Sequence, residues 1–472
     1  MSAFLIYEHD NTSHKITKLS THASQRIYDE KAEEQHHASM SHYRSIDSSV
    51  IDKGESHIPH FVSYIHLPIQ QLVLEIMAID LLPLPLPESA DPTKFTNFGR
   101  EVKGFDPATF SPEQFEELKD ALYKYDALLF RNVDMTPEQQ YALTKAFDPA
   151  SENYGHGNKQ TEADKKSILH PDLKTIPRVP QVQLIGNGMV YNHEGLAEAR
   201  LKHPHHKTFH KTIVSQEDED KGITRFYRWH IDAALYNLSP PKVTTLYALN
   251  VPQGPKQVVR YDDESGEELP VPLGTTAFVS GRTMFDILPK ELKSVAARAR
   301  VKYAPHPYVW MAPARAKSTG LGIESDGLES SFNDLPPWEE SRRKLYPVLW
   351  KNPATGELSF QVHPCGVAEL LIDPIPEGKP RDGALYPDGA HLTDLKEVRD
   401  LLYKMQRPAI SPNLVYPHDW QEKDMVLFHN RGLLHSVVGA FKEDQVRAFH
   451  QCNLAASDEP TGPTPEDVKI WA

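Results

Sequence analysis

The chain has 472 residues, of which 39% are hydrophobic, and its formal net charge is −14 at pH 7. This length allows up to three domains, although one large β fold with insertions also fits, and the apolar content is enough for a sizeable core. Lysine and arginine form no cluster of the kind that marks a nucleic-acid surface, so the composition argues against a nucleic-acid-binding protein.

The cysteine content and the hydropathy pattern indicate in which cellular compartment the protein acts. The chain carries two cysteines, Cys365 and Cys452, which argues against a disulfide scaffold or zinc knuckle and fits a reducing environment. The N-terminus lacks the basic-then-apolar pattern of a signal peptide. The apolar stretch 61–86 is interrupted by glutamines, acidic residues and prolines, so it does not read as a membrane span. We expect a soluble cytoplasmic protein with no membrane or nucleic-acid partner; the oligomeric state stays open.

The first residues differ in composition from the rest. Residues 30–60 are rich in His, Ser, Glu and Lys and show no sustained period. Such a segment buries too little apolar surface to offset the entropy lost on folding. Met77 then opens MAIDLLPLPLPES, which reads like a natural start. We expect residues 1–76 to be a disordered extension and residues 77–472 to form one folded domain.

The folded part is predicted to open with strand, helix, strand, helix. FGREVKGFD reads as a short strand closed by a glycine turn, and ALLFRNV as an apolar strand. Between them Ser111 is a helix cap, followed by proline and an acidic residue in the first turn. Phe115, Leu118 and Leu122 then recur at helical spacing. Thr136 begins a second helix with the same capping pattern.

Beyond Ala150 short β-like runs dominate and helices become few. The runs are QVQLIG, KVTTLYALNV, QVVRYDD, TTAFVSG, VKYAPHPYVWM, DMVLFHN and VRAFHQCNLA, with most prolines between them. Many short strands separated by turn residues predict a mainly β fold with flanking helices, a sandwich or jelly roll. Residues 311–345 show little periodicity and are predicted to be an inserted loop or lid.

The stretch FYRWHIDAALYNLSPP, residues 226–241, carries His230 and Asp232 two places apart. On a strand their side chains would project from the same face, close enough to hold one divalent metal. A second histidine would complete the facial triad of a non-haem Fe(II) site, which leaves coordination positions open for chemistry. The pair alone is weak evidence, because 24 histidines and 65 acidic residues produce such pairs by chance.

The second histidine is best placed at His435, in DMVLFHNRGLLHSVVG. Apolar stretches flank it, so we expect it on or beside a core strand. His429 is a rival for the same role, and either residue is equally consistent with an ordinary core histidine.

Arg447 follows in QVRAFHQCN, where an unbroken strand would put it on one face with Gln451 and Asn453. Burying these polar groups is costly unless they are satisfied, and arginine makes bidentate contacts with carboxylates. A bound polar ligand would satisfy them; an arginine paired with a structural acid is the alternative.

Several segments, taken in order, resemble motifs of the iron(II)/2-oxoglutarate dioxygenases of the taurine/2,4-D dioxygenase type. They are FGREVKGFD with SPEQFEELKDALYKYDALLFRN, then WHIDAALYNLSPP, PLGTTAFVSGRTMFDILP, YPVLWKNPATGELSFQVHP and FHNRGLLHS. The last segment departs from the family's WDNRxxxH pattern at Phe428 and His429. The resemblance spans residues 81–456 and implies a double-stranded β-helix (jelly roll) of the clavaminate synthase-like type.

The resemblance assigns metal and co-substrate roles. It implies that His230, Asp232 and His435 bind Fe(II), and that Thr276 and Arg447 hold the distal carboxylate of 2-oxoglutarate. O2 is then the second co-substrate, and a substrate C–H bond is hydroxylated as succinate and CO2 form. Taurine-type members carry a second arginine four places after the first, where this chain has Gln451. What steadies the C1 carboxylate therefore stays open.

Within the family the nearest resemblance is to the fungal xanthine dioxygenases, which implies hydroxylation of xanthine to urate. It suggests the substrate-binding residues Gln181, Gln183, Lys202, Glu219, Asp220, Gln451 and Asn453. Ordinary strand polarity for the two glutamines of QVQ, and a solvated loop for the EDED run, are the structural alternatives. Two other functions stay open: the same chemistry on a sulfonate or aryloxyalkanoate, which would need an extra basic residue facing the iron, and an inactive binding protein of this fold.

Overall fold

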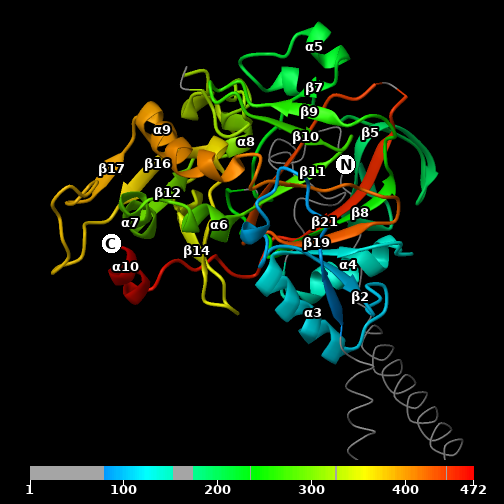
Figure 1. The fold of residues 1–472 in the computed structure, drawn as a ribbon, viewed down its shortest axis with the longest axis horizontal. Coiled ribbons are helices and arrows are strands. Elements are labelled where there is room, and N and C mark those ends of the chain that lie inside the picture. The colour runs from blue at the N-terminus through cyan, green and yellow to red at the C-terminus, as the bar shows by residue number, and fades with distance from the viewer. Residues whose placement is uncertain (1–78, 152–173, 234, 325–326, 443) are drawn as a thin grey trace, which may run out of the picture. The chain divides into compact units, whose positions relative to one another are not determined.

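The computed structural model of the protein describes residues 79–151, 174–233, 235–324, 327–442 and 444–472. These residues belong to one compact unit. They form mainly β structure with some helices, as the sequence predicts (Figure 1). The expected extension, residues 1–76, lies outside the described residues.

One large sheet forms the centre of the fold. Among the described residues it has nine strands, in the order β1-β2-β3-β19-β8-β21-β5-β4, with β6 paired to β5. The central strand β8 is rich in β-branched and apolar residues and is buried over most of its length, which suits a strand with neighbours on both edges. The strands are β1 (Asp80–Pro83), β2 (Arg100–Lys103), β3 (Ala127–Phe130), β4 (Lys174–Ile176), β5 (Val179–His193), β6 (Leu196–Leu201), β8 (Val243–Asn250), β19 (Met425–His429) and β21 (Arg447–Asn453).

Two helices pack on this sheet, and both begin as predicted. Helix α3 (Pro112–Tyr125) starts at a capping box: Ser111 Oγ accepts a hydrogen bond from Gln114 N at 3.2 Å, and the Gln114 side chain accepts one from Ser111 N at 3.0 Å. Helix α4 (Pro137–Ala146) is capped in the same way by Thr136. The buried side of α3 shares an apolar cluster with residues of β2, β3 and β19.

A three-stranded sheet, in the order β18-β11-β20, faces the large one. Phe278 of β11 packs on Phe428 of β19 with ring centroids 5.4 Å apart, and both share a buried cluster with Phe449 of β21. This face-to-face packing brings β11 and β20, which carry Thr276 and His435, close to β21, which carries Arg447, Gln451 and Asn453. The strands are β11 (Thr276–Ser280), β18 (Tyr416–Pro417) and β20 (Leu433–Val437).

Smaller sheets and short helices complete the described residues. The sheets are β10-β9-β7, β13-β12-β16-β17 and β14-β15. Their strands are β7 (Ile223–Thr224), β9 (Gln257–Arg260), β10 (Glu268–Val271), β12 (Ala299–Tyr303), β13 (Leu345–Pro347), β14 (Leu349–Lys351), β15 (Leu358–Phe360), β16 (Val367–Ile372) and β17 (Ala390–Leu392). The helices are α5 (Gln216–Asp220), α6 (Gly281–Asp286), α7 (Lys290–Arg298), α8 (Pro307–Trp310), α9 (Leu395–Gln406) and α10 (Pro465–Trp471).

The second half of the chain contains more helix than predicted. Helix α9 is capped by Asp394 and buries Val398, Leu402 and Met405. These residues recur at helical spacing, but the helix was not predicted because short β-like runs dominate this part of the sequence. The run VKYAPHPYVWM is also not one strand: β12 ends at Tyr303, and two prolines then precede and open helix α8.

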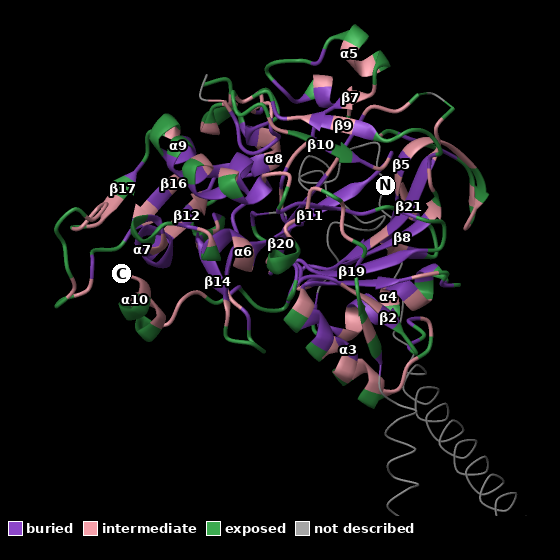
Figure 2. Ribbon diagram, viewed as in Figure 1, coloured by how far each residue is buried: buried purple, intermediate pink, exposed green. Residues whose placement is uncertain are grey.

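Residues 311–345, predicted as a loop or lid, contain little regular structure in their described part but are well packed. Ala316 forms β-bridges with both Ile323 and His210. Ala314, Ala316 and Ile323 are buried in one cluster with Trp310. Figure 2 shows the central strands, such as β19, coloured as buried. Whether this segment opens as a lid stays a prediction.

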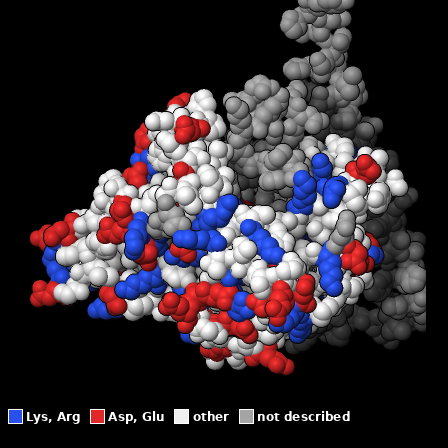
Figure 3. All heavy atoms as spheres, turned by 90° about the horizontal axis from the view of Figure 1, so that it is seen from above, with Lys and Arg blue, Asp and Glu red and all other residues white. Residues whose placement is uncertain are grey.

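The surface shows a mixed charge distribution. On the face drawn in Figure 3, lysine and arginine side chains are interspersed with acidic ones rather than gathered in one stripe. Among the described residues, no helix combines the length and apolar content that crossing a bilayer requires.

Candidate functional site

His230, Asp232 and His435 come together at one point. His230 and His435 exchange backbone hydrogen bonds of 3.0 Å each, so the two residues lie directly opposite one another. Their ring centroids are 4.2 Å apart. Asp232 Oδ1 lies 3.8 Å from His230 Nε2 and 3.6 Å from His435 Nε2. The three ligand atoms therefore surround one small volume, as a facial arrangement of two histidines and one carboxylate requires.

The protonation states of the three residues suit a cation. Burial lowers the pKa values of His230 and His435, which keeps both imidazoles neutral near pH 7. Burial alone would raise the pKa of Asp232, but the neighbouring His435 and His230 and a hydrogen bond from Thr244 outweigh it, and the pKa falls below its usual value. Two neutral imidazoles beside a carboxylate form a donor set that binds a divalent metal without first losing a proton.

The rest of Asp232 is held by its neighbours. Its Oδ2 accepts hydrogen bonds from Thr244 Oγ1 at 2.7 Å and Gln451 Nε2 at 3.3 Å. Its backbone N–H donates to Asn430 Oδ1 at 2.7 Å, and Asn430 Nδ2 donates back to its carbonyl at 2.8 Å. A hydrogen bond from Asn453 also favours the charged carboxylate. These contacts leave Oδ1 facing the histidines and fix its direction.

Two details of this region differ from the sequence expectation. The described part of the stretch 226–241 is not a continuous strand, because its pairing is limited to isolated β-bridges at Phe226, His230 and Tyr236, yet the two predicted side chains still converge. The rival His429 does not join them: its Nδ1 lies 3.2 Å from Asp126 Oδ1 at the end of α3. A Cβ on Gly432 would come within 2.2 Å of that Asp126 oxygen, so glycine is needed for this close approach.

Arg447 is buried beside this site. Its Nε donates to Gly274 O at 2.9 Å, its Nη2 donates to Thr276 Oγ1 at 3.2 Å, and its guanidinium lies 3.9 Å from the ring centroid of Phe449. Burial lowers the pKa of Arg447 to about 9. None of the carboxylates among the described residues forms an ion pair with it, so a buried cation is left without a counter-charge.

The predicted substrate residues lie in two places. Gln183 of β5 is buried directly opposite Gln451 of β21, and Gln451 and Asn453 both contact Asp232. Gln181 lies two residues earlier on β5 and is half-buried. These four glutamine and asparagine residues therefore belong to the strands that carry the site.

The other three predicted substrate residues lie on the β6–α5 part of the chain. Lys202 directly follows β6 and is exposed. Asp220 is exposed at the end of α5, where it accepts a hydrogen bond from Gln216. Glu219 contacts His205, His206 and Lys207. The substrate-binding roles of all seven residues stay predictions.

Several residues of the site were not predicted from the sequence. Asn430 and Thr244 orient Asp232, and Trp420 Nε1 donates to Thr276 Oγ1 at 3.3 Å. His363 is fully buried 6.0 Å from His230 between ring centroids, and neither of its ring nitrogens has a hydrogen-bond partner among the described residues. Only Asn430 and His363 left a sequence signal, since each stands in a segment that carries the family resemblance.

Comparison with known proteins gives the family. Residues 88–453 match the family described as taurine catabolism dioxygenase TauD, TfdA family. The chain belongs to this family. The predicted enzyme class, an oxidoreductase of the dioxygenase type, is thereby confirmed.

Individual relatives share about half of their sequence with the chain. It is 53% identical to alpha-ketoglutarate-dependent xanthine dioxygenase xan1 of Schizosaccharomyces pombe, over 82% of this chain and 90% of that protein. It is 52% identical to xanthine dioxygenase xanA of Emericella nidulans, over 81% and 98% respectively. A solved structure, a taurine dioxygenase from Burkholderia xenovorans, matches with a TM-score of 0.46 at 16% identity, over 82% of this chain and 93% of that one.

Proposed function

We propose that this TauD/TfdA family member is an Fe(II)- and 2-oxoglutarate-dependent dioxygenase that hydroxylates xanthine at C8 to give urate. In the balanced reaction, xanthine, 2-oxoglutarate and O2 yield urate, succinate and CO2. The choice of substrate rests on one observation, the identity of 50% or more to curated xanthine dioxygenases over four-fifths of the chain. The geometry of the site supports the chemistry.

His230, Asp232 and His435 would hold the iron. The fit is supported by two neutral imidazoles and an ionised carboxylate whose ligand atoms all lie within 4.8 Å of one another. This donor set, with one side left to other ligands, is typical of non-haem Fe(II) oxygenases. When bound, the iron with 2-oxoglutarate and O2 supplies the oxidising power that a C–H hydroxylation needs.

Arg447 would bind the distal carboxylate of 2-oxoglutarate. A buried guanidinium without a counter-charge is costly, and an incoming carboxylate would remove that cost through charge-assisted hydrogen bonds. Thr276 Oγ1 accepts from the guanidinium and so fixes its orientation, and Phe449 supports its flat face. These neighbours pre-organise the arginine before the co-substrate arrives.

Xanthine would be read by neutral polar groups. The ring is flat, polar at its edges and mostly neutral near pH 7, so it calls for groups that donate and accept. Asn453 Oδ1 and both ring nitrogens of His363 are buried beside the triad without hydrogen-bond partners among the described residues. Substrate atoms that pair with them would remove the cost of leaving them unsatisfied, and an analogue lacking such atoms would be rejected.

The proposal also covers the fold type, the cellular compartment and the binding partner. We propose that the two facing sheets form the double-stranded β-helix of the family, supported by the packing of Phe278 on Phe428. The proposed compartment is the cytoplasm, supported by Cys365 and Cys452, which are both buried and free. The proposed partner is the small-molecule substrate.

A direct assay tests the proposal. The purified chain is incubated with Fe(II), 2-oxoglutarate, ascorbate and xanthine, and urate and succinate are both measured. We expect equal amounts of the two products, and little turnover of hypoxanthine, which lacks the C2 carbonyl. Asp232→Ala should abolish both products, whereas Asp220→Asn should lower urate formation from xanthine if the predicted substrate-binding role of Asp220 holds.

A parallel series separates the substrate from the chemistry. The same assay is run with an alkyl sulfonate and an aryloxyalkanoate in place of xanthine. Succinate release on one of these, with no urate from xanthine, would leave the family chemistry intact and remove the purine substrate. No succinate with any substrate, although Fe(II) binds, would favour an inactive binding protein.

A further inference from the structure

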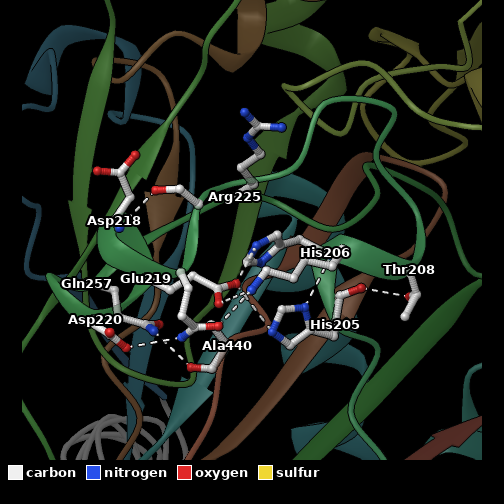
Figure 4. Close-up of polar contacts among 12 residues, drawn as sticks. His205, His206, Thr208, Asp218, Glu219, Asp220, Arg225, Gln257 and Ala440 are labelled. Carbon is white, nitrogen blue, oxygen red and sulfur yellow. Dashed lines mark hydrogen bonds and ion pairs between the residues drawn. The ribbon is translucent and has the colours of Figure 1, made fainter.

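A second cluster of metal-binding side chains lies outside the triad. Glu219 Oε1 is 3.4 Å from His205 Nε2 and 2.8 Å from His206 Nε2. Figure 4 shows the two imidazoles pointing at this carboxylate from the segment that follows β6, while Glu219 reaches across from α5. Its three ligand atoms also lie within 4.8 Å of one another. The cluster shares no residue with His230, Asp232 and His435, although it includes Glu219, for which metal binding is an alternative to the predicted substrate-binding role.

Hydrogen bonds and ion pairs do not account for this arrangement. His206 is fully buried, and neither its Nε2 nor Glu219 Oε1 has a hydrogen-bond partner of good geometry among the described residues. Burial, aided by the neighbouring His205, His210 and Arg225, lowers the pKa of His206 to about 3, so the ring is neutral near pH 7. Burial also lowers the pKa of His205. Two neutral imidazoles therefore face one carboxylate, and no hydrogen bond of good geometry joins His206 to it.

The second carboxylate oxygen is already occupied. Lys207 Nζ forms an ion pair with Glu219 Oε2, which leaves Oε1 turned toward the histidines. A metal ligand is commonly oriented in this way, by a neighbour that engages its other polar atom. The segment before the histidines is also tightly placed, since a Cβ on Gly439 would come within 2.3 Å of Pro204 O. The site is thus built from fixed elements.

We propose that His205, His206 and Glu219 bind a second divalent cation of the zinc class, separate from the predicted iron. Two imidazoles and one carboxylate, with a water in the fourth position, are a common zinc donor set. Tetrahedral zinc with bonds of about 2.0–2.1 Å spaces its ligand atoms by about 3.3 Å. The 3.4 Å spacing at His205 already matches, and the 2.8 Å spacing at His206 needs to widen by about half an ångström.

The bound ion would join two parts of the chain. His205 and His206 lie at the start of a loop that Glu219 closes on α5, and Gln257 of β9 and Ala440, which hydrogen-bond to each other at 2.9 Å, lie alongside (Figure 4). Cross-linking residues 205–219 through a metal constrains this loop in the folded state and lowers its rate of opening. The ion would therefore link the 3-10 turn that begins at His205 to helix α5.

The test counts zinc by equilibrium dialysis of the full chain against Zn²⁺, followed by metal analysis, without iron, 2-oxoglutarate or xanthine. We expect Glu219→Gln and His205→Ala each to bind one zinc fewer than the unaltered chain. Glu217→Gln is the matched control, because it makes the same change on an exposed residue of the same helix, and it should bind as many as the unaltered chain. Equal stoichiometry in Glu219→Gln and Glu217→Gln would overturn the proposal.

A second measurement separates this site from the triad and from misfolding. In chains that also carry His230→Ala, Zn²⁺ should raise the unfolding temperature with Glu217→Gln and should not do so with Glu219→Gln or His205→Ala. Unfolding temperatures in chelator report whether each variant folds; His205 is about one-third exposed, so its replacement leaves the core untouched. A zinc-induced rise that persists in both cluster variants would exclude His205 and Glu219 as ligands.

Discussion

The side chain of Arg447 is almost wholly buried. Its guanidinium donates hydrogen bonds to neutral acceptors but contacts no carboxylate of the described residues. In the protein without ligand this charge is a cost rather than a gain, because the desolvated guanidinium lacks a partner of opposite sign. Binding of 2-oxoglutarate would turn the same residue into a stabilising one. Arg447 should therefore be needed for binding of 2-oxoglutarate and contribute little net free energy to folding.

The variant Arg447→Met separates the effect of Arg447 on 2-oxoglutarate binding from its effect on folding. Binding of 2-oxoglutarate should weaken by about 2–5 kcal/mol, the usual cost of losing one side of a buried charged pair. The free energy of unfolding without 2-oxoglutarate should stay within about 1 kcal/mol of the unaltered chain, since the lost hydrogen bonds are offset by removal of the buried charge. Thr276→Val, which removes only a neutral acceptor, should weaken binding by about 1 kcal/mol. Denaturant unfolding with and without 2-oxoglutarate measures both the binding free energy and the free energy of unfolding. Unchanged 2-oxoglutarate affinity in Arg447→Met would contradict the proposed role of Arg447 in binding the co-substrate.

Asn430 is a positioning residue whose role can be separated from that of the ligands. It holds the backbone of Asp232 by two hydrogen bonds and also donates to Pro241 O at 2.9 Å. Asn430→Ala should lower metal affinity by about 10- to 100-fold, the usual effect of losing a group that orients a ligand. Asn250→Ala, at an exposed asparagine of β8, should leave it unchanged. Metal titration of the two variants gives the comparison, and equal affinities would mean that Asp232 is held by its other contacts.

Site residues could be predicted from the sequence only where a short sequence pattern marks them. His230 and Asp232 are two positions apart, and His435 stands in an apolar run, so a pattern search can find them. Thr244 and Trp420 contact the site through pairings between distant strands and side-chain directions that no local pattern contains. Gln451, a predicted substrate-binding residue, also donates to Asp232, a contact that depends on how β21 folds against the 226–241 stretch.

At the scale of elements, the approach of β5 to β21 is set by one glycine. Gly186 has φ +142°, and a Cβ there would come within 1.7 Å of Arg447 O. The two strands pair along this stretch, with Gly186 opposite Ala448. Any side chain at position 186 would therefore push β5 away from the strand that carries Arg447.

Gly186→Ala should destabilise the fold by more than about 3 kcal/mol, because overlap with the backbone adds to a conformational strain of about 1–3 kcal/mol. The matched control is Gly266→Ala, also at positive φ (+71°) but with nothing within 4 Å of its added Cβ. It should cost only about 1–2 kcal/mol, the penalty for a left-handed alanine. Denaturant unfolding of both variants provides the test; similar losses would show that β5 can shift to make room.

Elements with strong local signals were predictable, and those defined by distant contacts were not. Helices α3 and α4 begin where the Ser111 and Thr136 capping boxes place them, because a cap acts within three residues. Strands β8, β19 and β21 follow their apolar runs. Helix α9 has an equally clear apolar spacing but was hidden by the β-rich context, and β12 was extended too far across two prolines. The strand order depends on pairings between distant segments, which no local pattern contains.

At the scale of the whole molecule, the described elements begin at β1, which sets where the chain can be shortened. Ile79 is buried in the cluster that includes α3, and its N–H donates to Glu117 Oε1 at 3.1 Å. Strand β1 pairs with β2 from Asp80 to Pro83. The family match itself starts at residue 88. Among the described residues, the contacts of this edge all lie within a chain that starts at Met77.

A chain that begins at Met77 should unfold within about 0.5 kcal/mol of the full-length chain, the usual range for changes that touch no packed feature. It should also form urate at the same rate.

A chain that begins with methionine followed by Leu84 loses Ile79 and the whole of β1. It should be less stable by at least about 2 kcal/mol, because a buried isoleucine alone contributes about 1.5–3 kcal/mol and the edge of β2 loses its partner. Denaturant unfolding and urate formation are measured on all three chains. A marked loss in the chain that begins at Met77 would mean that residues 1–76 contribute to the stability or activity of the domain, and equal stability of the two shortened chains would mean that β1 adds nothing to the sheet.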